Sequence, residues 1–132
     1  MEDADSDVRG RALRSLAPAA APALLSELSK VLLDENAEPR VRVLAARKID
    51  EIPGEEADAV LLQAYQNAQQ WRLRRSLHVL LLARRTRLFD QVLTMDRSAN
   101  RDLALRLLER VLRIDPDYER ALTMKRNLEK AR

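Results

Sequence analysis

The chain has 132 residues, contains no cysteine and has only four aromatic side chains, while charged residues make up 34% of it. The absence of cysteine excludes disulfides and cysteine-ligated metal sites, and the scarcity of aromatic residues disfavours β-sheets. A formal net charge of +3 conceals an uneven distribution, because residues 1–66 carry 8 basic and 13 acidic side chains, whereas residues 67–132 carry 16 basic and 8 acidic ones. We therefore expect one all-α domain over residues 1–132, with an acidic first half and a basic second half.

A two-residue pattern, an apolar residue followed by Arg or Ala, begins a helical stretch four times, at intervals of about 30 to 33 residues. The four pairs are Val8-Arg9, Val41-Arg42, Leu73-Arg74 and Leu103-Ala104. Such a period indicates a stack of helix pairs, in which each pair buries its apolar face against the next. The predicted repeat units cover residues 5–36, 37–68, 69–97 and 98–132.

The first two units have the most regular helical patterns. The first unit is predicted to form helices over residues 7–17 and 21–34, the second of which has Pro22 in its first turn, where the fixed φ of proline is already helical. The second unit begins near Glu38, with a proline next in the chain, and its first helix ends at Ile52-Pro53-Gly54. Each unit is therefore predicted to be a helix-turn-helix.

The last two units are less regular. The third is predicted to start with a helix near Gln70, to break at the basic stretch 84–87, and to continue as a short helix over residues 88–95. In the fourth unit Ser98 is the predicted N-cap of a strongly amphipathic helix. Asp115-Pro116 supplies the predicted N-cap and first-turn proline of a polar terminal helix.

These patterns resemble the short HEAT-like repeats of the PBS-lyase type, in which a Val-Arg start, an Ala-rich helix and a Leu-rich helix follow one another. The segments from Asp7 to Leu33 and from Arg40 to Tyr65 match best, and the resemblance covers residues 5–95. Residues 104–122 resemble part of a tetratricopeptide repeat, with its closing proline. The resemblance implies a right-handed α-solenoid of about four antiparallel helix pairs, or about eight helices, acting as a binding scaffold.

Three arginines occupy equivalent starts of the units: Arg9, Arg42 and Arg74. One interpretation aligns their guanidinium groups along an edge that binds a carboxylate or phosphate. The favoured interpretation is structural, with each arginine bound to an acidic or amide group in the preceding turn, so that a ladder fixes the stacking of the repeats. The predicted partners are Asp3, Asp34 and Asn67.

If the chain is a scaffold, its contact residues are expected to be polar side chains on the second helix of each pair. The candidates for partner binding are Glu27, Lys30, Gln63, Gln66, Arg87 and Gln91. A basic edge is predicted beside them, formed by Arg74, Arg75, His78, Arg84 and Arg85. Trp71 is available for stacking on a base or a peptide, although a lone tryptophan beside an amphipathic helix is more often packed in a core.

The chain has little that predicts catalysis. His78 is the only histidine, no serine lies in a nucleophile elbow, and the two glycines do not form a phosphate-binding loop. Glu55, Glu56 and Asp58 are the densest acidic group, but the positive end of a helix dipole explains them. We therefore expect no enzymatic activity, no cofactor and no metal site, and a protein, peptide or helix as the partner.

Two alternatives stay open. A nucleic-acid-binding protein that uses the basic second half predicts binding that weakens steeply with salt. A fragment or subunit of a larger repeat protein predicts that Leu88, Phe89 and Met95 lie beneath a neighbouring unit that is missing from this chain. The acidic start lacks the features of a signal peptide, and no apolar run approaches the roughly 18 residues that a membrane span needs. We expect a cytoplasmic protein without membrane contact, of unspecified oligomeric state.

Overall fold

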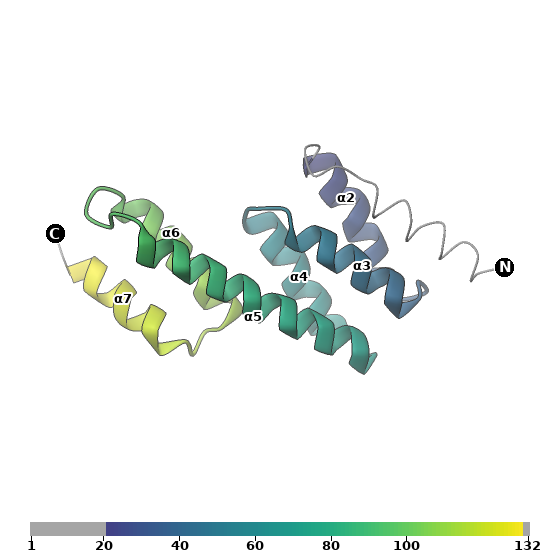
Figure 1. Cartoon of the computed structure of the whole chain (residues 1–132). Helices are drawn as coiled ribbons and strands as arrows, with labels where there is room; N and C mark the ends of the chain where they lie inside the picture. Colours follow the sequence, from purple (N-terminus) through teal and green to yellow (C-terminus); the bar gives the residue numbers. More distant parts are fainter. Residues whose placement is uncertain (1–20, 131–132) are drawn as a thin grey trace. The chain divides into compact units, whose positions relative to one another are not determined.

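The computed structural model describes residues 21–130, and this part of the chain is all-α, as predicted. Within it there are six helices and no strand (Figure 1). The helices are α2 (Ala21–Leu32), α3 (Pro39–Asp50), α4 (Glu55–Asn67), α5 (Trp71–Thr94), α6 (Arg101–Ile114) and α7 (Glu119–Lys130). The helix predicted over residues 7–17, together with Arg9 and Asp3, lies outside the described residues.

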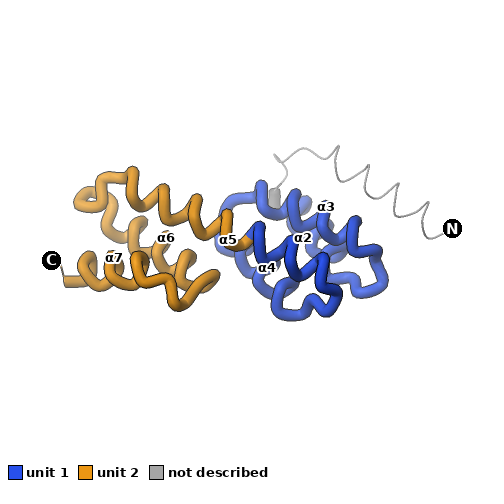
Figure 2. The backbone as a smooth tube through the Cα atoms, turned by 60° about the horizontal axis from the view of Figure 1, so that its bottom comes forward, with its two compact units in different colours: residues 1–80 blue, residues 81–132 orange. Residues whose placement is uncertain are grey.

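The chain divides into two compact units, residues 1–80 and 81–132, and the division falls within α5 (Figure 2). A single domain over residues 1–132 and a right-handed solenoid stay predictions. Each unit has its own buried apolar residues, and each is described separately below.

In the first unit α2 packs on α3, α3 packs on α4, and α2 also contacts α4. Two residues set the helix starts. Pro39 is the first residue of α3, after the extended Glu38, and Gly54 precedes α4 with a φ of 109° that residues with a side chain rarely adopt. The largest fully buried side chains of this unit are Leu28, Leu32, Ile49, Leu61, Leu73 and Leu77. The apolar faces of the helices in this unit therefore pack against one another, as the repeat pattern predicts.

The second unit is formed by the C-terminal part of α5 together with α6 and α7, which pack on each other. Its buried cluster joins Leu88, Phe89 and Val92 to apolar residues of α6 and to Ala121 of α7. Met95 packs, partly buried, against the same cluster. The prediction that Leu88, Phe89 and Met95 lie beneath a missing unit is therefore wrong, because residues of α6 and α7 pack against them.

The break predicted at residues 84–87 is absent, because α5 is one continuous helix of 24 residues. The basic stretch contains no glycine or proline, and arginine is a good helix former. Thr86 stays in the helix with its hydroxyl donating to the carbonyl of Leu82, 3.1 Å away. Seven of the eight predicted helices fall within residues 21–130, and the merger of two of them leaves the six helices observed there.

Both caps predicted in the last unit are also wrong. The N-cap of α6 is Asn100, whereas Ser98 lies in a turn in which its backbone N–H donates to Oδ1 of Asp96. Asp115 is the C-cap of α6, because its N–H continues the helix by donating to Val111 O at 2.9 Å. The final helix starts only at Glu119, after a turn closed by a bond from the N–H of Tyr118 to the carbonyl of Asp115.

Candidate functional site

Arg42 ties α3 to the end of α2. Its side chain is buried, with 8% of the residue exposed, and its Nε donates a 2.7 Å hydrogen bond to the carbonyl oxygen of Leu32, the last residue of α2. The last carbonyls of a helix lack partners within the helix, and a cation favours the negative end of the dipole. Arg42 therefore joins α2 to α3, which agrees with the structural interpretation, but this bond goes to a backbone carbonyl where the prediction named the side chain of Asp34.

Arg74 differs from Arg42, although both occupy equivalent positions in the repeat pattern. It is exposed, and its guanidinium carbon lies 4.7 Å from the centre of the Tyr65 ring of α4. The His78 ring stacks on the same tyrosine, with 5.8 Å between ring centres and 27° between ring planes. Tyr65 thus carries a cation and an imidazole from α5, an arrangement that the spacing of charged residues alone does not indicate.

The predicted basic edge is only partly exposed. Arg74, Arg75 and His78 are exposed on α5, but only 4% of Arg84 is exposed. Arg84 follows Leu77 and Leu81 at the helical spacing of the buried stripe, which explains its burial. Arg84 is therefore not part of an exposed basic edge.

Arg85 is half-buried and engaged within the second unit. Its Nη1 lies 2.7 Å from Oδ2 of Asp115, and its guanidinium carbon lies 4.5 Å from the centre of the Tyr118 ring. The ion pair joins α5 to the C-cap of α6, so that Arg85 holds two helices together. Thirty positions separate the two partners in the chain, which is why no local pattern points to the pair.

Trp71 is exposed over 63% of its surface, so the expectation that it packs in a core is wrong. It precedes the buried Leu73 by two positions, and two positions of a helix turn about 200°, which places the indole on the opposite face. The guanidinium carbon of Arg72 lies 5.4 Å from the centre of its ring. The side-chain oxygen of Gln70 accepts from the N–H of Leu73 at 2.8 Å and caps the helix here.

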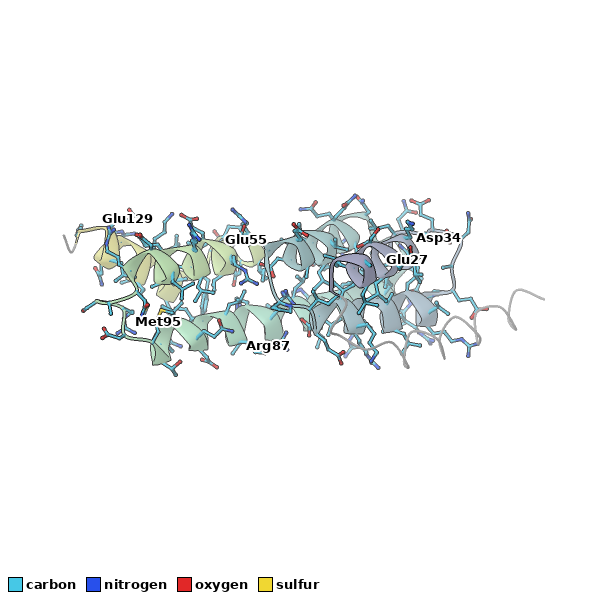
Figure 3. All side chains as sticks on the ribbon, turned by 90° about the horizontal axis from the view of Figure 1, so that it is seen from above. Glu27, Asp34, Glu55, Arg87, Met95 and Glu129 are labelled. Carbon is cyan, nitrogen blue, oxygen red and sulfur yellow. The ribbon has the colours of Figure 1, made fainter. Side chains whose placement is uncertain are left out.

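The six residues predicted to bind a partner are all exposed. Glu27 and Lys30 lie on α2, where Nζ and Oε1 are 3.3 Å apart, and Gln63 and Gln66 lie on α4. Since α2 contacts α4, the structure brings these four onto neighbouring helices of the first unit. The remaining two, Arg87 and Gln91, lie one turn apart on α5 in the second unit (Figure 3, where Glu27 and Arg87 are labelled).

Each unit also has an open groove that no sequence pattern predicted. In the first unit a groove of about 590 Å³ lies between α3 and the start of α5, with Arg40, Arg47 and Arg72 in its walls. In the second unit a groove of about 630 Å³ is lined by Phe89, by Met124 and by other residues of α7. Each groove is lined by side chains that are distant in the chain, so that a pattern along the sequence does not predict it.

Residues 21–130 show neither a metal-ligand cluster nor a membrane-spanning helix. This part of the chain has no cluster of three or more His, Cys, Asp or Glu side chains placed to hold a metal ion. None of its helices combines the length and the apolar character that crossing a membrane requires.

Consecutive helices that pack through apolar stripes, with a buried arginine joining one helix to the next, define a helical-repeat protein. The family model described as HEAT repeats matches residues 1–81, and the chain belongs to this family. Comparison with curated proteins and with solved structures gives no match. HEAT repeats are commonly scaffolds for protein interactions. The tetratricopeptide resemblance over residues 104–122 lies outside the matched segment and stays a prediction.

Proposed function

We propose that the protein is a non-catalytic interaction module that binds a peptide, a helix or a protein partner on the exposed face of α2 and α4. The observation that carries this proposal is the pairing of two contacting helices with exposed polar side chains, Glu27 and Lys30 on one and Gln63 and Gln66 on the other. Amide and charged groups of this kind recognise a partner by hydrogen bonds and ion pairs without covalent chemistry.

The packing beneath this surface supports the proposal. On each helix, the face opposite the exposed polar side chains is fully buried. These buried residues are Leu28 and Leu32 of α2 and Leu61 and Ala64 of α4. Buried anchors fix the backbone, so that a partner meets a surface that is ordered before binding. Such a surface loses little conformational entropy on association, which favours equilibrium recognition by stiff helices.

The test is affinity purification from cell extract followed by mass spectrometry, with the double variant Gln63→Ala/Gln66→Ala beside the wild-type protein. Gln69→Ala is a matched control, because Gln69 is also exposed but lies outside α4. We expect the double variant to recover at least about fivefold less of a specific partner, a loss of about 1 kcal/mol, and the control to recover it unchanged. Equal recovery by both variants contradicts the proposed surface.

The exposure of Trp71 favours nucleic-acid binding as a second candidate function. An exposed indole with Arg72 over its ring, followed by the exposed Arg75, combines a stacking surface with cations. Binding to single-stranded DNA should then fall steeply between low and physiological salt and should be lost in Trp71→Ala/Arg75→Ala. Binding that is absent at low ionic strength excludes this candidate.

A further inference from the structure

The groove of the first unit lies between α3 and the beginning of α5. Its volume is about 590 Å³, and Val43 and Leu44 supply apolar surface from the middle of α3. Arg40 and Arg47 line the groove from the same helix, and Arg72 lines it from α5. The groove uses none of the residues of the proposed α2–α4 surface, so that binding in the groove can be tested independently of that surface.

The spacing along α3 gives the groove an ordered pattern. Seven positions separate Arg40 from Arg47, which places the two cations on one stripe about two turns, or roughly 10.5 Å, apart along the axis. Val43 and Leu44 lie between them. A ligand that follows α3 therefore meets a cation, an apolar patch and a second cation in that order, with Arg72 on the other wall.

The charge of the groove is positive. Three arginines and one carboxylate, Glu38, are the ionisable groups that line it. Oε2 of Glu38 lies 3.1 Å from Nε of Arg40, but 61% of this arginine side chain is exposed. Although only 30% of the Glu38 side chain is exposed, Arg40 is largely accessible to water, which weakens the ion pair, so that a carboxylate of a ligand can compete with Glu38 for Arg40.

We infer that this groove binds an acidic peptide segment in which an apolar side chain lies between carboxylates. The arginines match carboxylates because a guanidinium group donates two parallel hydrogen bonds to their oxygens. The apolar side chain of the peptide packs on Val43 and Leu44. A peptide fits better than a nucleic acid, because the described residues that line the groove include no aromatic ring on which a base stacks.

Binding of the fluorescein-labelled peptide Glu-Asp-Glu-Leu-Glu-Asp-Glu to the full chain, measured by anisotropy at low salt, tests the inference. Trp71 is the only tryptophan and directly precedes Arg72, so that its fluorescence reports binding independently. We expect the wild-type protein to bind, and the double variant Arg47→Glu/Arg72→Glu to bind about tenfold or more weakly. The variant Arg75→Glu/Arg126→Glu carries the same change of charge at exposed arginines outside the groove lining, and should bind within about twofold of wild type.

Changes in the peptide test the apolar patch and the arginines of the groove separately. Exchanging its leucine for glycine should weaken binding several-fold, and exchanging its acids for amides should abolish it. The groove variant should gain binding to the lysine analogue of the peptide, which also shows that the variant is folded. Gln63→Ala/Gln66→Ala should leave peptide binding unchanged.

Three results overturn the inference. The first is an equal loss of binding in the groove variant and in its charge-matched control. The second is peptide binding that is unchanged when the leucine is exchanged for glycine. The third is oligothymidine binding that is tighter than peptide binding and is lost in the groove variant.

Discussion

Replacing Arg42 by alanine tests whether the buried arginine holds α2 and α3 together. The change removes a 2.7 Å bond to the Leu32 carbonyl at a site where only 8% of the arginine is exposed. A hydrogen bond from a charged donor contributes about 1.5 to 3 kcal/mol, and the buried aliphatic stem adds roughly 1 kcal/mol of packing. We expect the free energy of unfolding of the first unit to fall by about 3 kcal/mol.

Urea unfolding followed by Trp71 fluorescence is the appropriate assay, because the only tryptophan lies in the first unit. With a denaturant slope of about 1.5 kcal/mol/M, the midpoint should fall by about 2 M. Arg47→Ala is the matched control, since Arg47 lies on the exposed face of the same helix and should change stability by no more than about 0.5 kcal/mol. A loss below about 1 kcal/mol for Arg42→Ala, or an equal loss in the control, refutes the stacking role.

Three further changes test other parts of the structure. Gly54→Ala should destabilise the first unit by about 1 to 2 kcal/mol in the same urea assay, because the φ of 109° strains any residue with a side chain. Unchanged stability would contradict the positive φ at this position. Phe89→Ala should cost the second unit about 3 to 5 kcal/mol, seen as early loss of helical circular dichroism on heating, because the ring is fully buried; an unchanged melting curve argues against this core. In a double-mutant cycle of Arg85→Ala and Asp115→Ala, we expect a coupling energy of about 1 kcal/mol, since 21% and 30% of the two side chains are exposed; additive effects would show that the pair does not interact.

The helices were predictable where the chain itself supplies the signal. Pro39 begins α3 and Gly54 precedes α4 because their backbone preferences act locally, whatever the rest of the chain does. The apolar stripe of Leu28 and Leu32 is likewise a property of helical period. The Val41-Arg42 start identified the repeat family that the family comparison shows.

The errors arose where a local pattern was ambiguous. The charged stretch 84–87 suggested a loop, yet one turn of helix distributes its side chains over all faces, and Arg84 falls on the buried one. Asp115-Pro116 has the residues of a helix start, yet Asp115 still continues the hydrogen bonding of α6. Residue type predicts that Trp71 packs in a core, whereas its position relative to the buried Leu73 turns it outward.

For the candidate interaction residues, the sequence predicted their exposure but not their proximity to one another. Their exposure follows from polarity and helical period, so that Glu27 and Gln63 were expected on a surface from the sequence alone. Their proximity depends on the contact between α2 and α4, which buried apolar faces bring about. The groove between Arg40, Arg47 and Arg72 likewise exists only because two helices distant in the chain lie beside each other.

The sequence by itself determined the all-α class, the helix starts at Pro39 and directly after Gly54, and the membership of a repeat family, because backbone preference and apolar period are local properties. Only the tertiary structure decided that Arg42 is buried while Arg74 is exposed on Tyr65, and that Arg85 pairs with Asp115. Equivalent positions in a repeat receive different neighbours once the chain is packed. Burial and pairing depend on those neighbours, and the period of the sequence does not contain them.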